Sequence, residues 1–314
     1  MSWQPGAATE HLRARADLLT QIRQFFSARS VLEVETPLLA SAGVTDPSIE
    51  PIIADCGSEA RYLQTSPEYA MKRLLAGGAP DIYQICKAFR AHEVGHRHNP
   101  EYTLLEWYRL DLDHYALLRE VAELICSVTA VDGWQSWPYR TLLQHVLNID
   151  PMTASYADLN AVAQHHCGEI PGDLDRDGLL DVLMSHVIEP AIADWGLVFV
   201  VDYPVSQAAL ARKVISADVI VGARFEAYLG GVELANGYWE ASDAGDLRER
   251  FEADNKLRRQ RGLVRRPIDE RLLSAMEAGM PDCAGVALGV DRLLACRLGR
   301  SDIRPLLAFD WSRS

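Results

Sequence analysis

The sequence lacks any stretch long enough to cross a membrane. Its strongly apolar runs are short, such as WGLVFVV at 195–201, whereas a bilayer requires about 20 apolar residues. The first residues, MSWQPGAATEHLRARADLL, contain no apolar core of the kind that a secretory signal needs. We therefore expect a cytoplasmic protein with no membrane partner.

Paired cysteines are also missing. The six cysteines are scattered, with no Cys-x-x-Cys pair, at Cys56, Cys86, Cys126, Cys167, Cys283 and Cys296. Such spacing supports neither a zinc knuckle nor a redox motif. We interpret all six as reduced thiols, most of them packed.

The sequence has few positively charged residues. It contains 31 Lys and Arg and 44 Asp and Glu, which gives a net charge of −13. Nucleic-acid affinity rests on Lys and Arg, so this balance argues against a tRNA partner, although a local patch can override it. One such patch lies at 248–266, where eight Lys or Arg stand against three acids. It is either a solvated helix face or a docking surface for an acidic partner.

The remaining composition is that of a soluble globular protein. With 314 residues, 48% of them hydrophobic and 24% charged, the chain fits one large domain or two medium ones. Apolar residues recur at helical spacing over 12–30. Those expected on the buried side are Leu12, Ala16, Leu19, Ile22, Phe25 and Phe26. The run VLEVETPLL at 31–39 then predicts a strand that ends at Pro37.

Residues 66–78, SPEYAMKRLLAGG, have the start and stop signals of a helix. Ser66 is a plausible N-cap, Pro67 suits the first helical position, and Gly77-Gly78 ends the helix. Further helical patterns lie at 114–131, 139–190 and 243–262, and strand patterns at 197–204, 224–240 and the start of 285–299. Apparent hairpins among the strands favour an antiparallel sheet with helices packed around it, which is an α+β fold.

The stretch FRAHEVGHRHNPEYTLLEWYR at 89–109 packs histidines, arginines and an Asn-Pro between two apolar runs. Its flanks predict a hairpin with a long loop at about 91–101. His92 and His96 would share one face of a helix, but Gly95 and the Asn-Pro break a helix. With no acidic or Cys partner in register, a metal-binding triad is the weaker hypothesis.

Strand alternation suggests what this hairpin can present. Leu104, Glu106 and Tyr108 share one face of the second strand, and Gln84 and Arg90 share one face of the first. If the two faces coincide, Arg90, Glu106 and Tyr108 converge on one floor. Arginine suits a phosphate because its planar guanidinium donates in pairs and keeps its charge. Taken alone, the arginine is equally consistent with a solvated loop side chain.

Four segments, taken together, resemble the class II aminoacyl-tRNA synthetases, specifically their lysyl subgroup. The segment FRAHEVGHRHNPEYTLLEW is similar to motif 2, GVALGVDRLL to motif 3, and RQFFSARSVLEVETPLL to motif 1. In addition, GVELANGYWE resembles the ELANG strand of that subgroup. The segments span most of the chain in the family's order, which is more specific than any single motif.

The resemblance implies a single class II synthetase-like catalytic domain over 1–314, with an antiparallel sheet flanked by helices. Because motif 1 begins by Arg23, we expect no anticodon-binding OB domain. A lysyl-type core that stands alone is similar to the bacterial ligases that lysylate elongation factor P. That similarity implies ATP and Mg²⁺ as cofactors, (R)-β-lysine or lysine as donor, elongation factor P as acceptor, and a homodimer.

Two other functions stay open. One is a free-standing amino-acid-activating enzyme with a tRNA or small-molecule acceptor. The other is a non-catalytic, synthetase-like regulatory subunit. Such subunits usually lose their phosphate-binding arginines, whereas Arg90, Arg292, Glu233 and Glu240 are all present here.

The family's motifs assign ATP-binding residues by position. Arg90 matches the motif 2 arginine that holds the α-phosphate and the substrate carboxylate, and Arg292 matches the motif 3 arginine on the γ-phosphate. These two are the expected catalytic residues. The other expected ATP contacts are Ala91, His92, Asn99, Glu233, Leu234 and Gly289, with His98 as a further loop candidate.

The same motifs assign the amino-acid pocket and the metal ligands. The expected substrate-binding residues are Ser66, Pro67, Glu68, Tyr108 and Glu240, and the expected Mg²⁺ ligands are Glu233 and Glu240. Because the two ligands are seven residues apart, a regular strand would point them to opposite faces. If both are to reach the site, we expect a bulge or bend within 235–237. Taken alone, Ser66 is more simply explained as a helix cap. Tyr108 is also consistent with a core residue, and each carboxylate with the surface.

Several positions depart from the family pattern. Ala91-His92 stands where Asn-Glu is usual, so the contact at 92 is in doubt and Glu93 is a candidate substitute. Ala287 replaces a glycine, and its methyl group can bar an α-amino group while tolerating a β-amino group. Gly245 replaces a glutamate, which also points away from α-lysine. Nothing in the sequence explains Trp239 in place of histidine.

Overall fold

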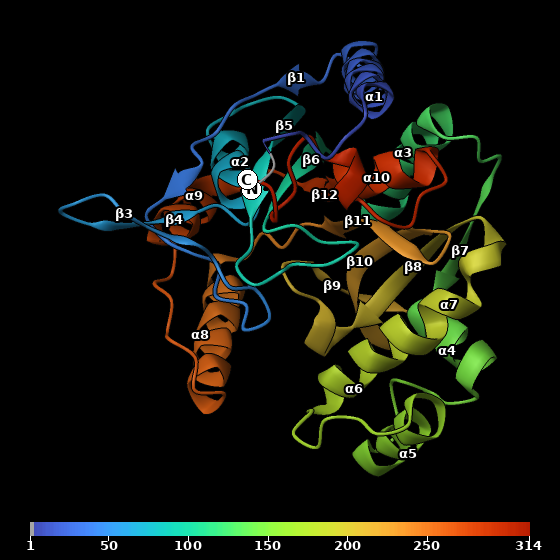
Figure 1. The fold of residues 1–314 in the computed structure, drawn as a ribbon. Coiled ribbons are helices and arrows are strands. Elements are labelled where there is room, and N and C mark those ends of the chain that lie inside the picture. Colours follow the sequence, from blue (N-terminus) through green and yellow to red (C-terminus); the bar gives the residue numbers. More distant parts are fainter. Residues whose placement is uncertain (1–2) are drawn as a thin grey trace. The chain divides into compact units, whose positions relative to one another are not determined.

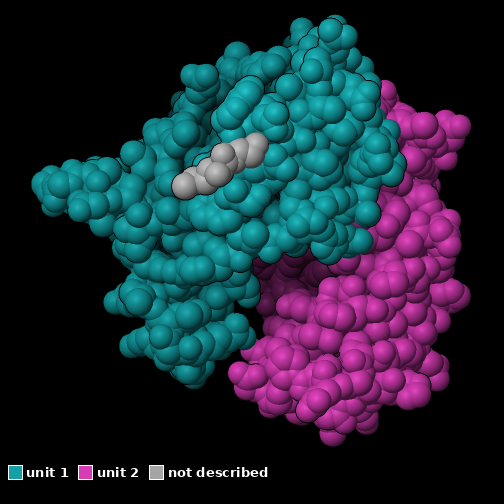
Figure 2. Space-filling view, in the orientation of Figure 1, with its two compact units in different colours: residues 1–112, 241–314 teal, residues 113–240 magenta. Residues whose placement is uncertain are grey.

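The structure is a computed structural model that describes residues 3–314 and divides into two compact units. Unit 1 consists of the residues up to Leu112 together with Ala241–Ser314, and unit 2 is Asp113–Glu240. Figure 1 labels the elements along the chain, and Figure 2 colours the two units. Helices and mostly antiparallel strands occur in both, which confirms the predicted α+β class.

The sheet of unit 1 has the strand order β1-β5-β6-β12. Strand β1 (Leu32–Glu33) runs parallel to β5 (Ile82–Phe89). Strands β5, β6 (Glu101–Leu110) and β12 (Cys283–Gly289) pair antiparallel. The β5–β6 pair is the hairpin predicted from the sequence, and its loop occupies 90–100.

The helices of unit 1 lie around this sheet, apart from the helix over 244–260, which runs away from it (Figure 1). They are α1 (Thr9–Ser27), α2 (Glu68–Ala76), α8 (Ala244–Gln260), α9 (Glu270–Gly279) and α10 (Val290–Arg297), with a 3₁₀ turn η4 (Arg304–Leu306). A small second sheet has the order β2 (Leu39–Ala40), β4 (Ala60–Leu63), β3 (Ile53–Asp55). Helix α9 and this small sheet were not predicted.

Helix α1 is anchored by residues four apart. Leu18, Ile22 and Phe26 are fully buried, because that spacing places them on one helix face. The Phe26 ring stacks on Tyr83 with ring centroids 4.3 Å apart and meets Trp107 edge-on at 5.3 Å. The predicted helix was three residues late at each end. Its buried face was partly wrong, because Leu18 was missed and Leu12 and Ala16 are exposed.

The strand predicted over 31–39 is largely wrong. Only Leu32–Glu33 pairs with β5, and Leu39–Ala40 pairs separately with β4. The apolar, β-branched composition was typical of a strand. However, Pro37 has no N–H to donate to a neighbouring strand. Strand β5 pairs with only two residues of this segment, Leu32 and Glu33. The segment between β1 and β2 belongs to no strand.

Unit 2 has the strand order β11-β10-β8-β7, with β9 paired to β10. The strands are β7 (Trp134–Pro138), β8 (Leu197–Pro204), β9 (Lys213–Ser216), β10 (Val219–Leu229) and β11 (Val232–Trp239). Only β7–β8 is parallel. The single strand pattern predicted over 224–240 is a hairpin that turns at Gly230-Gly231, where both glycines have positive φ.

The predicted helices of unit 2 are confirmed. They are α3 (His114–Val128), α4 (Tyr139–Leu147), α5 (Tyr156–Cys167), α6 (Arg176–Leu183), the π-helix η1 (Met184–Ile188) and α7 (Glu189–Ala191), followed by 3₁₀ turns η2 (Ala193–Trp195) and η3 (Val205–Gln207). Leu142, Leu183 and Val200 belong to one buried cluster that joins α4 and α6 to β8. Over residues 3–314, no helix is long and apolar enough to cross a membrane.

Candidate active site

The register of the β5–β6 hairpin confirms that Glu106 and Tyr108 share one floor, whereas Arg90 lies beyond the paired residues. Gln84 lies opposite Glu106, and Ile82 lies opposite Tyr108. Opposed residues of an antiparallel pair share a face, so Glu106 and Tyr108 stand beside Gln84 on one surface. Arg90 follows directly after β5, where its N–H donates to the carbonyl of Pro100 at 2.9 Å.

Three of the predicted pocket residues gather around Glu106. The Ser66 hydroxyl donates to Oε2 of Glu106 at 2.7 Å, and the Tyr108 hydroxyl donates to Oε1 at 2.7 Å. Ser66 also accepts the N–H of Glu68 at 3.0 Å, so it caps α2 from the residue before its N-cap, Pro67. The cap and pocket hypotheses for Ser66 are therefore compatible, because one hydroxyl serves both contacts.

A second carboxylate next to this group has its own cation. The amine of Lys72, which is fully buried, donates to Oε1 of Glu68 at 2.6 Å. Burial, and after it the charge of Glu68, raises the pKa of Glu106 to about 8, against the opposing effects of Ser66, Tyr108 and Lys72. A buried carboxyl group that titrates near neutrality is suited to receive a cation from outside.

The two predicted catalytic arginines both contact the 90–100 loop. Arg90 lies 3.7 Å from the carboxylate of Glu93. The guanidinium of Arg292 donates to Nε2 of His98 at 2.6 Å and to the carbonyl of Arg97 at 3.3 Å. Desolvation and the charge of Arg292 lower the pKa of His98, which favours the neutral imidazole that can accept this bond. Arg90 is thus the first residue of the loop, and Arg292 of α10 contacts the loop near its end.

Motif 3 is fastened to the hairpin by a buried carboxylate. Asp291 accepts the N–H of Thr103 at 2.8 Å and a guanidinium N–H of Arg15 at 2.6 Å. Arg15 also donates to the hydroxyl of Thr103 at 2.6 Å. Arg292 follows Asp291 in the first turn of α10, after Gly289 as its N-cap. The backbone that carries Arg292 is therefore fixed against β6.

Asn99 is engaged at both ends of its amide. Its Oδ1 accepts the N–H of Trp311 at 2.9 Å, and its Nδ2 donates to the carbonyl of Glu101 at 2.7 Å. These bonds attach the C-terminal segment to the base of the loop. A nucleotide contact from Asn99 stays a prediction, and it would require the amide to exchange a partner.

The residues after Arg90 differ in how far they are fixed. The N–H of Ala91 donates to the carbonyl of Glu50 at 2.8 Å. His92 is exposed and adopts a left-handed conformation with φ of 68°, which is uncommon for a non-glycine residue. Glu93, the candidate substitute for the contact in doubt at 92, is the residue that pairs with Arg90.

The two predicted metal ligands lie in unit 2, and a bulge aligns them. Glu233 lies opposite Tyr228 and Ala235 lies opposite Ala227, which leaves Leu234 as the extra residue. The bulge is confirmed, but it lies just before the segment 235–237 where we expected it. Because the extra residue makes the spacing effectively even, Glu233 and Glu240 point to the same face.

On this same face lies a buried ion pair, because Glu226 lies opposite Asn236 and Tyr228 lies opposite Glu233. The Glu226 carboxylate accepts the hydroxyl of Tyr203 at 2.6 Å, the hydroxyl of Tyr228, and the guanidinium of Arg224 at 2.5 Å. Although burial acts to lower it, the charge of Glu226 raises the pKa of Arg224 above its usual value. Arg224 also donates to Oδ1 of Asn236 at 3.2 Å, which orients a polar side chain between the two candidate ligands.

Unit 1 therefore brings together Ser66, Glu68 and Tyr108 around one carboxylate. It also places Arg90 at the start of the 90–100 loop, whose residue His98 contacts Arg292 of α10. Sequence reasoning put Glu106 on the floor but gave it no role, although its position between two hydroxyls makes it the centre of the group. Lys72 was missed as well. Its spacing of four residues from Glu68 on a helix was the available signal.

Within residues 3–314, no three His, Cys, Asp or Glu side chains gather as a metal site. A Mg²⁺ ion held by two carboxylates commonly completes its octahedral shell with phosphate oxygens and water. Glu233 and Glu240 supply hard oxygen donors on one face, so they fit this kind of site. Their role as ligands stays a prediction.

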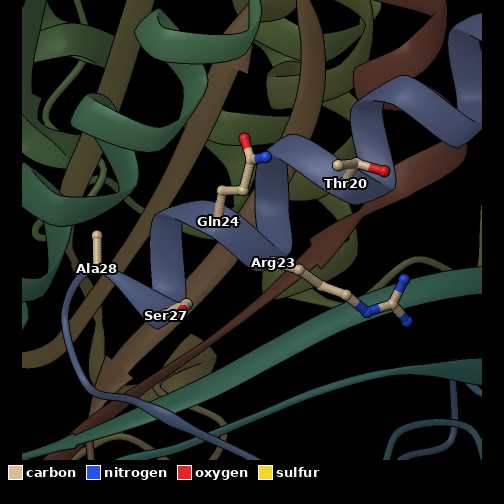
Figure 3. A pocket seen from close by; sticks show the side chains of 5 residues that line it. All are labelled: Thr20, Arg23, Gln24, Ser27 and Ala28. Carbon is tan, nitrogen blue, oxygen red and sulfur yellow. The ribbon is translucent and has the colours of Figure 1, made fainter.

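A separate shallow pocket lies on one side of α1 (Figure 3). It is lined by Thr20, Arg23, Gln24, Ser27 and Ala28. Its one charged residue, Arg23, is paired with Glu33 at 3.1 Å. Because a single helix supplies the whole lining and none of the predicted site residues is among it, this pocket is a poor candidate for the active site.

Comparison with known proteins places the chain among close relatives. The family model for class II tRNA synthetases (D, K and N) matches residues 2–312. A protein of Mannheimia succiniciproducens is 46% identical over 98% of this chain and 97% of its own length. One from Pasteurella multocida is 45% identical over the same shares, and one from Salmonella paratyphi A is 44% identical over 100% and 98%. All three are named elongation factor P–(R)-β-lysine ligase.

Proposed function

The chain belongs to the class II tRNA synthetase family (D, K and N), and we propose that it is an ATP-dependent ligase acting on a protein. In the proposed reaction it activates (R)-β-lysine as the adenylate and transfers the aminoacyl group to a lysine side chain of elongation factor P. The similar proteins that carry this name match nearly the full chain, which supports the proposal. We treat residues 1–314 as one catalytic domain.

The observation that carries the proposal is the environment of Glu106. Its carboxyl group is buried between the hydroxyls of Ser66 and Tyr108, with no cation of its own among the described residues. The ammonium group of a lysine-like substrate would supply the missing charge. A pocket for a neutral amino acid would have little use for a buried carboxyl group held in this way.

The proposed reaction has two steps. In the first, a carboxylate oxygen of the amino acid attacks the α-phosphorus of ATP, and the bond to pyrophosphate breaks. In the second, a lysine amine of the acceptor attacks the acyl carbon, loses a proton and displaces AMP. Arg90 would hold the α-phosphate and the substrate carboxylate, and Arg292 the γ-phosphate. Their permanent charge stabilises the oxygens on which negative charge collects.

Other residues would position substrate and metal. Ala91, His92 or Glu93, Asn99, Leu234 and Gly289 would line the ATP site, and Pro67, Glu68 and Glu240 the amino-acid site. Glu233 and Glu240 would hold Mg²⁺, which neutralises phosphate charge when it is bound. Leu234 would contribute main-chain groups, since a bulge residue lies outside the strand ladder.

The preference for a β-amino acid would come from Ala287. In the register of β12 with β6, Ala287 lies directly opposite Glu106, so its methyl group shares the face of the pocket floor. A methyl group there would occupy the space that the α-amino group of lysine needs. It would leave room for an amino group on the β-carbon of the substrate. This supports (R)-β-lysine over lysine as the donor.

We further propose a cytoplasmic homodimer that uses the motif 1 region. Leu32 of β1 and Leu39 of β2 are 51% and 42% exposed, which is costly for a surface that stays in water. Light scattering at several concentrations would test this. A monomer at all of them would contradict it.

The experiment that tests the function is an intact-mass assay. Purified protein would be incubated with ATP, Mg²⁺, (R)-β-lysine and elongation factor P, with α-lysine and bulk tRNA in parallel. We expect one β-lysyl group on the factor with the wild type and none with Arg90→Ala. Label on tRNA, or an adenylate that forms without transfer to the factor, would contradict the proposal and favour the free-standing activating enzyme.

A further inference from the structure

The basic patch of 248–266 divides into residues that the fold uses and residues that it leaves exposed. Arg248 pairs with Glu270 at 2.6 Å, and Arg250 pairs with Asp246 one helical turn earlier. Arg258 is fully buried and donates to Glu50. Arg266 also pairs with Glu50, so at least four of the eight cations are engaged within the fold.

The exposed remainder lies at the end of α8. Lys256, Arg259 and Arg265 are exposed, and each is without an ion-pair partner in the part of the chain that the structure describes. From residue 256 to residue 266 the sequence contains no acid. This local excess of positive charge stands on a chain whose net charge is −13.

The turn that follows α8 is held rigidly from inside. Buried Arg258 donates from Nε to the carbonyl of Val264 at 2.7 Å, and its own carbonyl accepts the N–H of Leu263 at 2.8 Å. The side chain of Asn255 donates to the carbonyl of Arg266 at 3.0 Å and accepts its N–H at 2.8 Å. These hydrogen bonds fix the turn in one conformation.

This rigid turn presents an aliphatic side chain to water. Val264 is 68% exposed and lies next to Arg265. Cations in the last turn of a helix stabilise the helix dipole, which accounts for Arg259 without any partner. It does not account for Arg265 or Val264, because both lie beyond the helix.

We propose that Lys256, Arg259, Val264 and Arg265, here called the α8 tip, form a docking surface for an acidic protein, namely the acceptor of the aminoacyl group. Complementary charge steers and orients protein partners, and an aliphatic residue between cations gives the contact an apolar centre. Nucleic acid fits less well, because the chain is strongly acidic and the segment 256–266 has no aromatic residue on which a base could stack.

The α8 tip is linked to the proposed active site within unit 1. The carboxylate of Glu50 accepts from both Arg258 and Arg266, which carry the turn. The carbonyl of Glu50 accepts the N–H of Ala91, the residue after Arg90. A protein bound at the tip would therefore be held at a fixed place relative to the loop on which Arg90 lies. This inference rests on the proposed function, since it assumes a protein acceptor.

The test reverses the charge of the tip. The triple variant Lys256→Glu, Arg259→Glu, Arg265→Glu would be compared with the control Arg73→Glu, Arg119→Glu, Arg300→Glu, which makes the same charge change at exposed arginines elsewhere. The rate of acceptor modification would be followed by intact mass at varied acceptor concentration. Pyrophosphate exchange with ATP and amino acid alone would report the first step.

We expect the tip variant to raise the KM for the acceptor about tenfold or more, as the loss of several steering charges would, with an unchanged exchange rate. The control variant should match the wild type in both assays. Added salt should raise the acceptor KM of the wild type and leave that of the tip variant nearly constant. Val264→Ser should raise it by a smaller factor.

An acceptor KM equal to that of the wild type would overturn the docking surface, as would an equal rise in the control. Binding of RNA by the wild type, lost in the tip variant, would overturn it in favour of a nucleic-acid surface. Failure of the proposed function is distinguishable from these outcomes, because the wild type itself would then leave the factor unmodified.

Discussion

Two buried glutamates, Glu106 in unit 1 and Glu226 in unit 2, are alike in most of their surroundings. Each lies on a strand, and each accepts hydrogen bonds from two hydroxyl groups. For Glu226 these belong to Tyr203 and Tyr228. They differ in their cation, because Glu226 also accepts from Arg224 at 2.5 Å.

Glu106 has no such partner. Its two donors are Ser66 and Tyr108, and the nearby cation of Lys72 is paired with Glu68. A buried carboxylate that is paired with an arginine has its charge neutralised within the fold and needs no further partner. The pKa of Glu106 stays raised, because burial and the charge of Glu68 outweigh its two hydroxyl donors and the nearby Lys72. We therefore assign its electrostatic partner to the substrate. The comparison separates a carboxylate that serves the fold from one that we assign to the substrate.

The largest effect on stability should come from breaking the ion pair between Arg224 and Glu226. Glu226→Gln leaves the guanidinium of Arg224 buried without its counter-ion, which costs about 3–5 kcal/mol in the free energy of unfolding. Urea unfolding would measure it. The double variant Arg224→Met, Glu226→Gln removes both charges and should recover most of the loss. If Glu226→Gln is as stable as the wild type, the ion pair does not contribute to the free energy of unfolding in this way.

The same substitution at Glu106 should affect the substrate and spare the fold. At neutral pH a carboxyl group whose pKa is about 8 is mostly protonated, so Glu106→Gln should leave the melting temperature nearly unchanged. Removing a buried charged partner costs roughly 2–5 kcal/mol, or about 30-fold and more in KM for the amino acid. Pyrophosphate exchange would measure this. A normal KM would remove Glu106 from the substrate site.

The methyl group opposite Glu106 should decide between donors. Ala287→Gly should raise kcat/KM for α-lysine about tenfold or more, in line with the usual effect of one methyl group in a pocket. Ala284→Gly, which deletes a methyl group from the other face of β12, is the matched control. If both variants respond alike, the selectivity does not arise at Ala287.

A smaller effect is expected from one hydroxyl. Ser66→Ala removes a donor to Glu106, and a hydrogen bond to a group of this kind contributes about 1 kcal/mol, or roughly fivefold in KM for the amino acid. Because this bond lowers the pKa of Glu106, its loss should raise that pKa further. Ser66→Thr keeps the hydroxyl and should retain most of the affinity. Equal values for the two variants would argue against this role of the hydroxyl.

Much of the site in unit 1 could be predicted from local patterns. The hairpin and the shared face of Glu106 and Tyr108 follow from strand composition and alternation, although the register of the hairpin does not. The helix that starts after Ser66 follows from its start and stop signals. The same holds for the strand that runs into α10 before Arg292. In each case the residues that set the local structure lie within a few positions of one another.

What could not be predicted depends on residues far apart in the chain. Glu50 and Arg258 are 208 positions apart, and their pairing has no local signal. The bulge was inferred from the need to align Glu233 with Glu240, but its place at Leu234 is set by the partner strand β10. The strand expected over 31–39 failed for a similar reason, because strand propensity is realised only where a neighbouring strand is available.

The most direct test of the contrast between the two glutamates is the proton released when the amino acid binds. If the substrate ammonium is the partner of Glu106, binding should lower the raised pKa of that carboxyl and expel most of one proton near pH 7. Calorimetry in buffers of different ionisation enthalpy would count it. We predict a release in the wild type that is lost in Glu106→Gln, with amino-acid affinity rising with pH up to about 8. Binding with no proton released, or the same release in the variant, would contradict the assignment of Glu106 to the substrate.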